Sequence, residues 1–212
     1  KKDRKQNMKI DLHKFSQDEF TFNISHLKHE EKSSKGFVLV LPGAGYSHMG
    51  PCIYYPSTML FEAGYEIVNI EYDLRWGQLL ESSQTYYGKL MRFIEESVNS
   101  LDLPEDRLVL AKSIGTRLLA SLDVQATKYI WLTPALKDDF VVEAILSQNE
   151  KSLVVIGDKD PFYLPDQITL FSESLVIKDA DHGLDIDNCI DSSLKVLKEL
   201  VQTIEKFFIK TN

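Results

Sequence analysis

The feature that most constrains the fold of this chain is a repeated alternation of short apolar runs with longer amphipathic segments. Each run is rich in β-branched or aliphatic residues and is bounded by turn formers, which is typical of buried parallel strands. The predicted strands are residues 36–41, 65–72, 107–111, 129–133, 153–156 and 175–177. The predicted helices are residues 54–63, 81–101, 114–122, 140–148 and 189–209.

This alternation, without an internal repeat or a Gly/Ser-rich linker, predicts one domain over residues 1–212. The expected fold class is α/β, with a doubly wound, mostly parallel sheet flanked by helices. Residues 1–35 are polar, and we expect them to form an N-terminal extension of the domain. Within it, the alternating residues 20–24 predict an edge strand before a charged turn at residues 29–35.

The charge balance argues against nucleic acid as a partner. The chain has 24 Lys and Arg residues against 32 Asp and Glu residues, a formal charge of −8, whereas binding to phosphate backbones needs a basic face. Cys52 and Cys189 lie far apart and suggest neither a disulfide framework nor a zinc site. No apolar run reaches the length of about 18 residues that a membrane span needs. We therefore expect no membrane partner and a cytoplasmic location.

In doubly wound sheets, ligands gather at the carboxyl ends of the strands, so the residues after each predicted strand are informative. Ser113 follows the strand at residues 107–111, between the small residues Ala111 and Gly115. This pattern is typical of a sharp turn that holds a hydroxyl clear of the sheet. The backbone N–H of Ile114 then lies at a helix start, where it can meet an oxyanion. The same residues also fit a serine that only caps the helix.

Two later loops carry a carboxylate and an imidazole. Asp160 follows the predicted strand at residues 153–156, and His182 follows the strand at residues 175–177. A histidine on such a loop can serve as general base to a serine, and a carboxylate can hold its productive tautomer. The chain order Ser, Asp, His is that of the α/β-hydrolase catalytic residues.

Other carboxylates compete with Asp160 for this role. Asp158 lies two residues earlier, and Asp138 and Asp139 follow the predicted strand at residues 129–133. We prefer Asp160 because it lies later in its loop, where the chain should have turned toward the histidine. A Ser–Lys pair with Lys112 is disfavoured, since adjacent strand residues point to opposite sides.

No cofactor motif is complete. Residues 43–45 start like a dinucleotide loop, but His48 stands where the third glycine belongs. Residues 179–183 start like a calcium loop, but the glycine comes one place early. His26 and His29 lie in polar surroundings that favour a solvated turn over a metal pair. We expect neither a metal nor an organic cofactor.

The four loops together resemble those of the α/β-hydrolases, particularly small uncapped members of the dienelactone-hydrolase-like kind. The resemblance rests on residues 41–45, 111–116, 157–161 and 180–183, and it spans residues 36–209 in motif order. It implies that Ser113 is the nucleophile, Asp160 the acid and His182 the base. It also implies that the N–H groups of Ala44 and Ile114 form the oxyanion hole.

The resemblance leads to a function. We expect a serine hydrolase that cleaves a small carboxylic ester or thioester through an acyl-enzyme on Ser113. The alternative is a hydrolase fold with weak catalysis that serves as a binding or interaction module. Residues 133–153 leave room for only one helix, so no separate cap domain is expected over the site. The aromatic residues expected on loops at this edge, where they would line the substrate pocket, are Tyr46, Trp76, Phe162 and Tyr163.

Overall fold

A computed structural model describes residues 8–30, 33–72 and 83–209, and in this part of the chain one eight-stranded sheet forms the centre. The strand order is β1-β2-β4-β3-β5-β6-β7-β8. Strands β3 to β8 run parallel to one another, whereas β2 is antiparallel to both of its neighbours, β1 and β4. The strands are β1 (Met8–Gln17), β2 (Phe20–His29), β3 (Phe37–Leu41), β4 (Glu66–Tyr72), β5 (Arg107–Lys112), β6 (Lys128–Leu132), β7 (Ser152–Gly157) and β8 (Ser174–Ile177).

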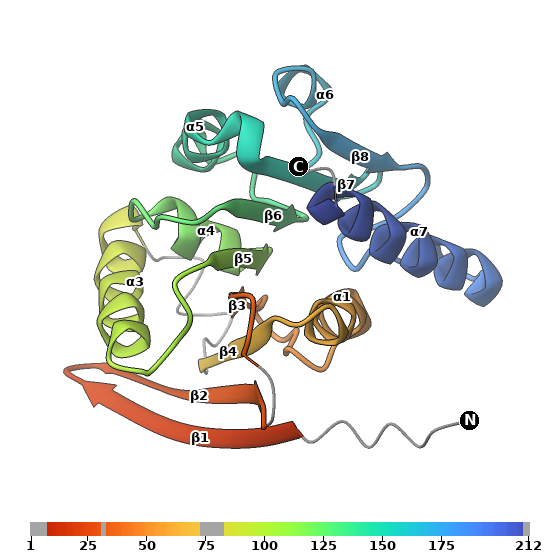
Figure 1. Ribbon diagram of the computed structural model, residues 1–212. Helices are drawn as coiled ribbons and strands as arrows, with labels where there is room; N and C mark the ends of the chain where they lie inside the picture. Colours follow the sequence, from red (N-terminus) through yellow and green to blue (C-terminus); the bar gives the residue numbers. More distant parts are fainter. Residues whose placement is uncertain (1–7, 31–32, 73–82, 210–212) are drawn as a thin grey trace, which may run out of the picture.

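Helices cover both faces of the sheet (Figure 1). Helices α1 (Pro51–Glu62) and α7 (Ile190–Ile209) lie on one face. Helices α3 (Gln84–Asn99), α4 (Ile114–Ala120) and α5 (Asp139–Ser147) lie on the other. The sheet therefore separates two hydrophobic cores, which is the doubly wound arrangement that the sequence predicted.

The six predicted strands and five predicted helices are confirmed, with shifts of a few residues at their ends. The strands are apolar on both faces because each face of the sheet is covered, and β3, β6 and β7 are buried at every position. Only α5 and a short 3₁₀ helix (Asn149–Lys151) lie between β6 and β7, so no cap domain is inserted there. Helix α6 (Pro165–Ile168), a single helical turn, was not predicted from the sequence.

The N-terminal region differs from its prediction. Instead of one short strand and a charged turn, residues 8–29 form a hairpin of two ten-residue strands. Strand β2 pairs with β1 through His29, and it also pairs with β4 from Phe22 to Leu27. The solvated turn expected around His26 is wrong: His26 is fully buried, and the His29 ring stacks on Phe61.

The buried His26 gives the fold a testable pH dependence. Its Nε2 lies 2.6 Å from Glu66 Oε2, while its buried Nδ1 has no hydrogen-bond partner among the described residues. Protonating Nδ1 would bury an unpaired N–H, and burial lowers the pKa of His26 below its usual range despite the Glu66 contact. The unfolded chain then binds more protons as pH falls below about 6.5, so folding stability decreases with acidification.

We expect His26→Gln to lose less stability than the wild type between pH 7.5 and 5.5. Glutamine can still donate to Glu66 but does not titrate. Urea unfolding at the two pH values measures the effect. Equal losses in both proteins would assign the acid sensitivity to other groups.

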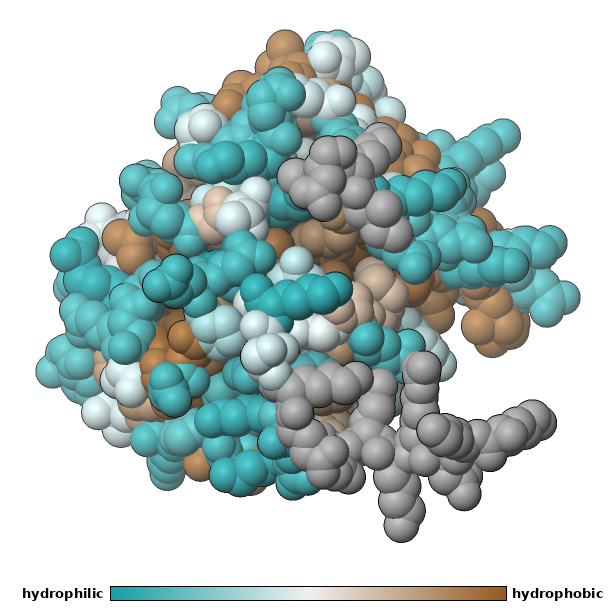
Figure 2. Space-filling view, in the orientation of Figure 1, coloured by the Kyte–Doolittle hydropathy of each residue, from teal (hydrophilic) through white to brown (hydrophobic). Residues whose placement is uncertain are grey.

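The face of the molecule turned toward the reader in Figure 2 is mostly polar. Figure 2 shows hydrophilic residues over much of this face, with hydrophobic patches between them, one of them near the start of α7. Ile190 and Leu194 are exposed there. Among the described helices, none has the length and apolar character needed to span a bilayer.

Candidate active site

Ser113 occupies a strained turn between β5 and α4. Its backbone has φ 53° and ψ −114°, a left-handed conformation that costs a serine roughly 1–3 kcal/mol. Its side chain makes no capping hydrogen bond to α4, so the capping interpretation does not hold. The Oγ atom lies instead 2.8 Å from His182 Nε2.

Two glycines let the chain pass closely around Ser113. A Cβ atom on Gly115 would lie 2.1 Å from the carbonyl oxygen of Leu41, so α4 crosses β3 at a distance that only glycine allows. A Cβ atom on Gly43 would lie 3.4 Å from Ser113 Cβ, which places the loop after β3 beside the serine. Of the small residues expected at this turn, Gly115 is therefore explained by its close contact with the backbone of Leu41.

His182 connects Ser113 to Asp160. The histidine lies on the loop between β8 and α7, and its Nδ1 is 2.8 Å from Asp160 Oδ2. The Asp160 side chain is fully buried, whereas the His182 side chain is 29% exposed. The network assigns the Nδ1 proton to the bond with Asp160, which leaves Nε2 to accept the Ser113 proton.

The structure selects Asp160 among the candidate carboxylates. Its second oxygen, Oδ1, accepts a hydrogen bond of 2.8 Å from the Phe162 backbone N–H, which helps to hold the carboxylate in place. Asp158 instead accepts from the Asp179 backbone N–H at 2.7 Å. Asp138 forms an ion pair with Arg117, and Asp139 is exposed at the start of α5.

The predicted oxyanion donors flank the serine. Ile114 begins α4, directly after Ser113, and Ala44 follows Gly43 in the loop after β3. Neither N–H donates to a described residue, so both are available to a ligand oxygen. Tyr72, at the end of β4, donates its hydroxyl proton to the Pro42 carbonyl oxygen and so braces this loop. Burial raises the pKa of Tyr72, which keeps that proton in place.

The aromatic residues predicted to line the pocket do not all lie at one place. The ring of Phe162 lies 5.4 Å from the His182 ring, measured between centroids. Tyr163 packs against the core on the α3 side. Tyr46 accepts a hydrogen bond of 2.9 Å from the Cys52 N–H and packs on the opposite core. Trp76 lies outside the described residues.

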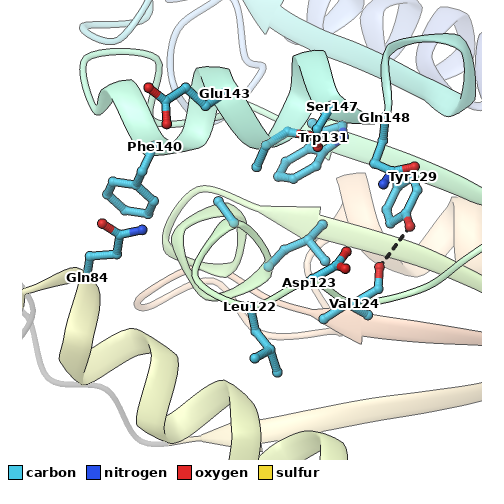
Figure 3. A pocket seen from close by; sticks show the side chains of 13 residues that line it. Gln84, Leu122, Asp123, Val124, Tyr129, Trp131, Phe140, Glu143, Ser147 and Gln148 are labelled. Atoms are coloured by element: carbon cyan, nitrogen blue, oxygen red, sulfur yellow. Dashed lines mark hydrogen bonds between the residues drawn. The ribbon is translucent and has the colours of Figure 1, made fainter.

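A cavity of about 450 Å³ opens elsewhere, between α4, β6 and α5 (Figure 3). Tyr129 and Trp131 line it, and their polar atoms are already bonded to Val124 and Ser152. None of the predicted site residues lines this cavity. No group of three or more potential metal-ligating side chains occurs in the part of the chain described.

The strand order, the strained serine after β5 and the absence of a cap between β6 and β7 define the class: the chain has the α/β-hydrolase fold without a lid. No protein-family profile matches the sequence, and no curated protein does. The similarity is therefore structural.

Several solved structures share the fold. Est1E from Butyrivibrio proteoclasticus is 12% identical with a TM-score of 0.65, over 94% of this chain and 99% of that chain. Dienelactone hydrolase from Anabaena variabilis is 15% identical with a TM-score of 0.65, over 96% and 98%. An α/β serine hydrolase without a lid from Xanthomonas campestris is 13% identical with a TM-score of 0.68, over 95% and 94%.

Two residues beside the site were not predicted to contribute to it. Tyr72 ends a strand and belongs to no motif, and Lys112 was considered only as the partner in a disfavoured Ser–Lys pair. Only the contacts of these side chains with Pro42 and with His182 reveal their place beside the site. Their one available signal was a polar residue at the carboxyl end of a buried strand.

Proposed function

We propose that the protein is a serine hydrolase that cleaves a small carboxylic ester or thioester through an acyl-enzyme on Ser113. The observation that carries the proposal is the continuous hydrogen-bond chain from Ser113 Oγ through His182 to the buried Asp160. The nucleophile, the general base and the orienting carboxylate are therefore hydrogen-bonded to one another in the order that acyl transfer requires.

The chemistry begins when Ser113 Oγ attacks the substrate carbonyl carbon and His182 Nε2 takes the hydroxyl proton. Asp160 stabilises the imidazolium that results. The carbonyl oxygen becomes an oxyanion and accepts hydrogen bonds from the Ala44 and Ile114 N–H groups, each contributing about 3–4 kcal/mol by comparison with another serine enzyme. The imidazolium then protonates the leaving alcohol or thiol as its bond to the acyl carbon breaks.

Deacylation reverses these roles. His182 removes a proton from water as the water oxygen attacks the acyl carbon, and the proton then passes to Ser113 Oγ as the acid leaves. Each proton that His182 takes is returned, and no atom changes its oxidation state, so the cycle needs neither an oxidant nor a reductant. The residues described perform every step without a cofactor.

The substrate class rests on the open site and on the similar proteins. No cap covers the loop edge between β6 and β7, and Phe162 supplies an apolar wall beside His182. The similar structures include a dienelactone hydrolase and Est1E, the latter also solved with ferulic acid bound. A substrate with a small acyl group and an alcohol or thiol leaving group fits an open site with one apolar wall.

A fluorophosphonate probe tests the proposal, because it labels a serine only when a base activates the hydroxyl. We expect the wild type to be labelled, Ser113→Ala to lose the label, and the control Ser147→Ala to keep it. Ser147 is an exposed serine at the end of α5. An unlabelled, folded wild type would favour the binding or interaction module instead. Ester, thioester and amide substrates compared on wild-type protein that has not been treated with the probe then define the leaving group.

A further inference from the structure

We propose that Lys112 is a positioning residue, whose buried side chain holds the His182 backbone where the imidazole can reach Ser113; the role in turnover rests on the proposed function. Lys112 ends β5, directly before the serine, and its side chain is only 1% exposed. Its Nζ donates hydrogen bonds of 2.9 Å to the His182 carbonyl oxygen and 2.9 Å to Thr133 Oγ1.

The surroundings of Nζ fit an ammonium group. An ammonium has three N–H donors, and three acceptors face it: the His182 carbonyl, the Thr133 hydroxyl and the ring of Tyr46 at 4.8 Å. Burial lowers the pKa of Lys112, while Cys52 and the carboxylates of Asp160, Asp181 and Asp185 act in the opposite direction. Each proton of the charged form therefore has an acceptor.

One side chain thereby joins four strand ends. Lys112 itself ends β5, Tyr46 lies in the loop after β3, Thr133 follows β6, and His182 lies in the loop after β8. A buried lysine is costly unless it is fully hydrogen-bonded, and an aliphatic residue would fill the same space at a lower desolvation cost. What lysine provides here, and an aliphatic residue would not, is the set of contacts that links these loops.

The His182 loop is held beside the histidine by the Lys159 N–H, which donates to the Ala180 carbonyl at 3.0 Å, and by the Cys52 thiol, 3.5 Å from the Gly183 carbonyl, whereas Lys112 bonds to the backbone of His182 itself. The loop follows the four-residue strand β8, and Asp179 and Leu184 have left-handed backbones on either side of the histidine. The Asp181 side chain accepts from the N–H groups of Gly183 and Asp185, so these bonds are local to the loop. Lys112 adds a charged hydrogen bond from the sheet to the histidine itself. A displacement of about 1 Å in a catalytic group can lower the rate by roughly 10²-fold.

The test compares Lys112→Met with Lys128→Met. Lys128 is also a buried lysine, and it donates to the Phe207 carbonyl oxygen on α7, which is not part of the site. We expect Lys112→Met to lower kcat by roughly 10- to 100-fold with KM within about twofold of wild type. Lys128→Met should reduce stability without changing kcat in the folded protein.

Proton NMR supplies a readout that does not depend on turnover. The His182 Nδ1 proton bonded to Asp160 should give a far-downfield resonance in the wild type and in Lys128→Met, and His182→Ala assigns it. In folded Lys112→Met we expect this resonance to shift or broaden. A wild-type resonance together with a wild-type kcat in Lys112→Met would overturn the proposal.

A second variant covers the case in which Lys112→Met does not fold. Thr133→Val removes one of the two oxygen acceptors of Nζ and leaves the His182 contact. It should produce a severalfold decrease in kcat and a smaller change in the same resonance; no change in either would overturn the proposal. If the wild type neither turns over a substrate nor takes the fluorophosphonate label, the proposed function fails. The comparison of the His182 resonance between the wild type and Lys112→Met still decides whether Lys112 positions His182.

Discussion

Replacing His182 with alanine is expected to lower kcat for p-nitrophenyl butyrate by roughly 10⁴- to 10⁶-fold. Without the imidazole, no described group hydrogen-bonded to Ser113 Oγ can take its proton. The side chain is 29% exposed and lies on a loop, so the melting temperature should stay close to that of the wild type. Steady-state kinetics and a melting curve on the same preparation measure both quantities.

His13→Ala is the control for this experiment. His13 lies on β1, at the opposite edge of the sheet from β8, and its loss should leave kcat unchanged. Substantial turnover by folded His182→Ala, abolished by adding Ser113→Ala, would show that another group activates the serine and would remove His182 from the role of base.

Replacing Gly115 with alanine is expected to destabilise the protein by about 3 kcal/mol or more. The new Cβ would lie 2.1 Å from the Leu41 carbonyl oxygen and 2.8 Å from its carbon, and both are backbone atoms of the central strand β3. Helix α4 must therefore move away from the sheet. For a chain of this size, the melting temperature should fall by roughly 6–12 °C.

Gly88→Ala is the matched control, because it makes the same change inside α3. There the nearest atom to the new methyl group would be the Ser121 carbonyl oxygen at 3.3 Å, which needs only a small adjustment. Its effect should be much smaller than that of Gly115→Ala. Equal melting temperatures for Gly115→Ala and wild type would contradict the close crossing of α4 and β3.

The order of the strands and helices was predictable because both faces of the central sheet are buried. Strands that are buried on both faces require apolar residues at every position, as in residues 153–156, and local turn formers mark where these runs end. The residues after these runs could then be assigned to one edge, since parallel strands place their carboxyl ends together. Ser113, Asp160 and His182 were found in this way.

The N-terminal hairpin was not predictable on the same grounds. Strand β1 lies at the edge of the sheet and exposes Met8, Ile10 and Leu12. Its pattern therefore carries little information about burial. Strand β2 extends to His29 because it pairs with β1 along its whole length, and its other partner, β4, lies far away along the chain.

The sequence by itself determined the α/β class, the edge of the sheet where chemistry can occur, and the identity of the serine and histidine, because these follow from local periodicity and from strand ends. The tertiary structure showed that Asp160, which the sequence favoured over Asp158, is the carboxylate that meets His182, and it alone decided that Lys112 reaches the histidine loop. Such choices depend on side-chain directions and on distances of a few ångströms between segments about 20 to 70 residues apart in the chain, which no local pattern encodes.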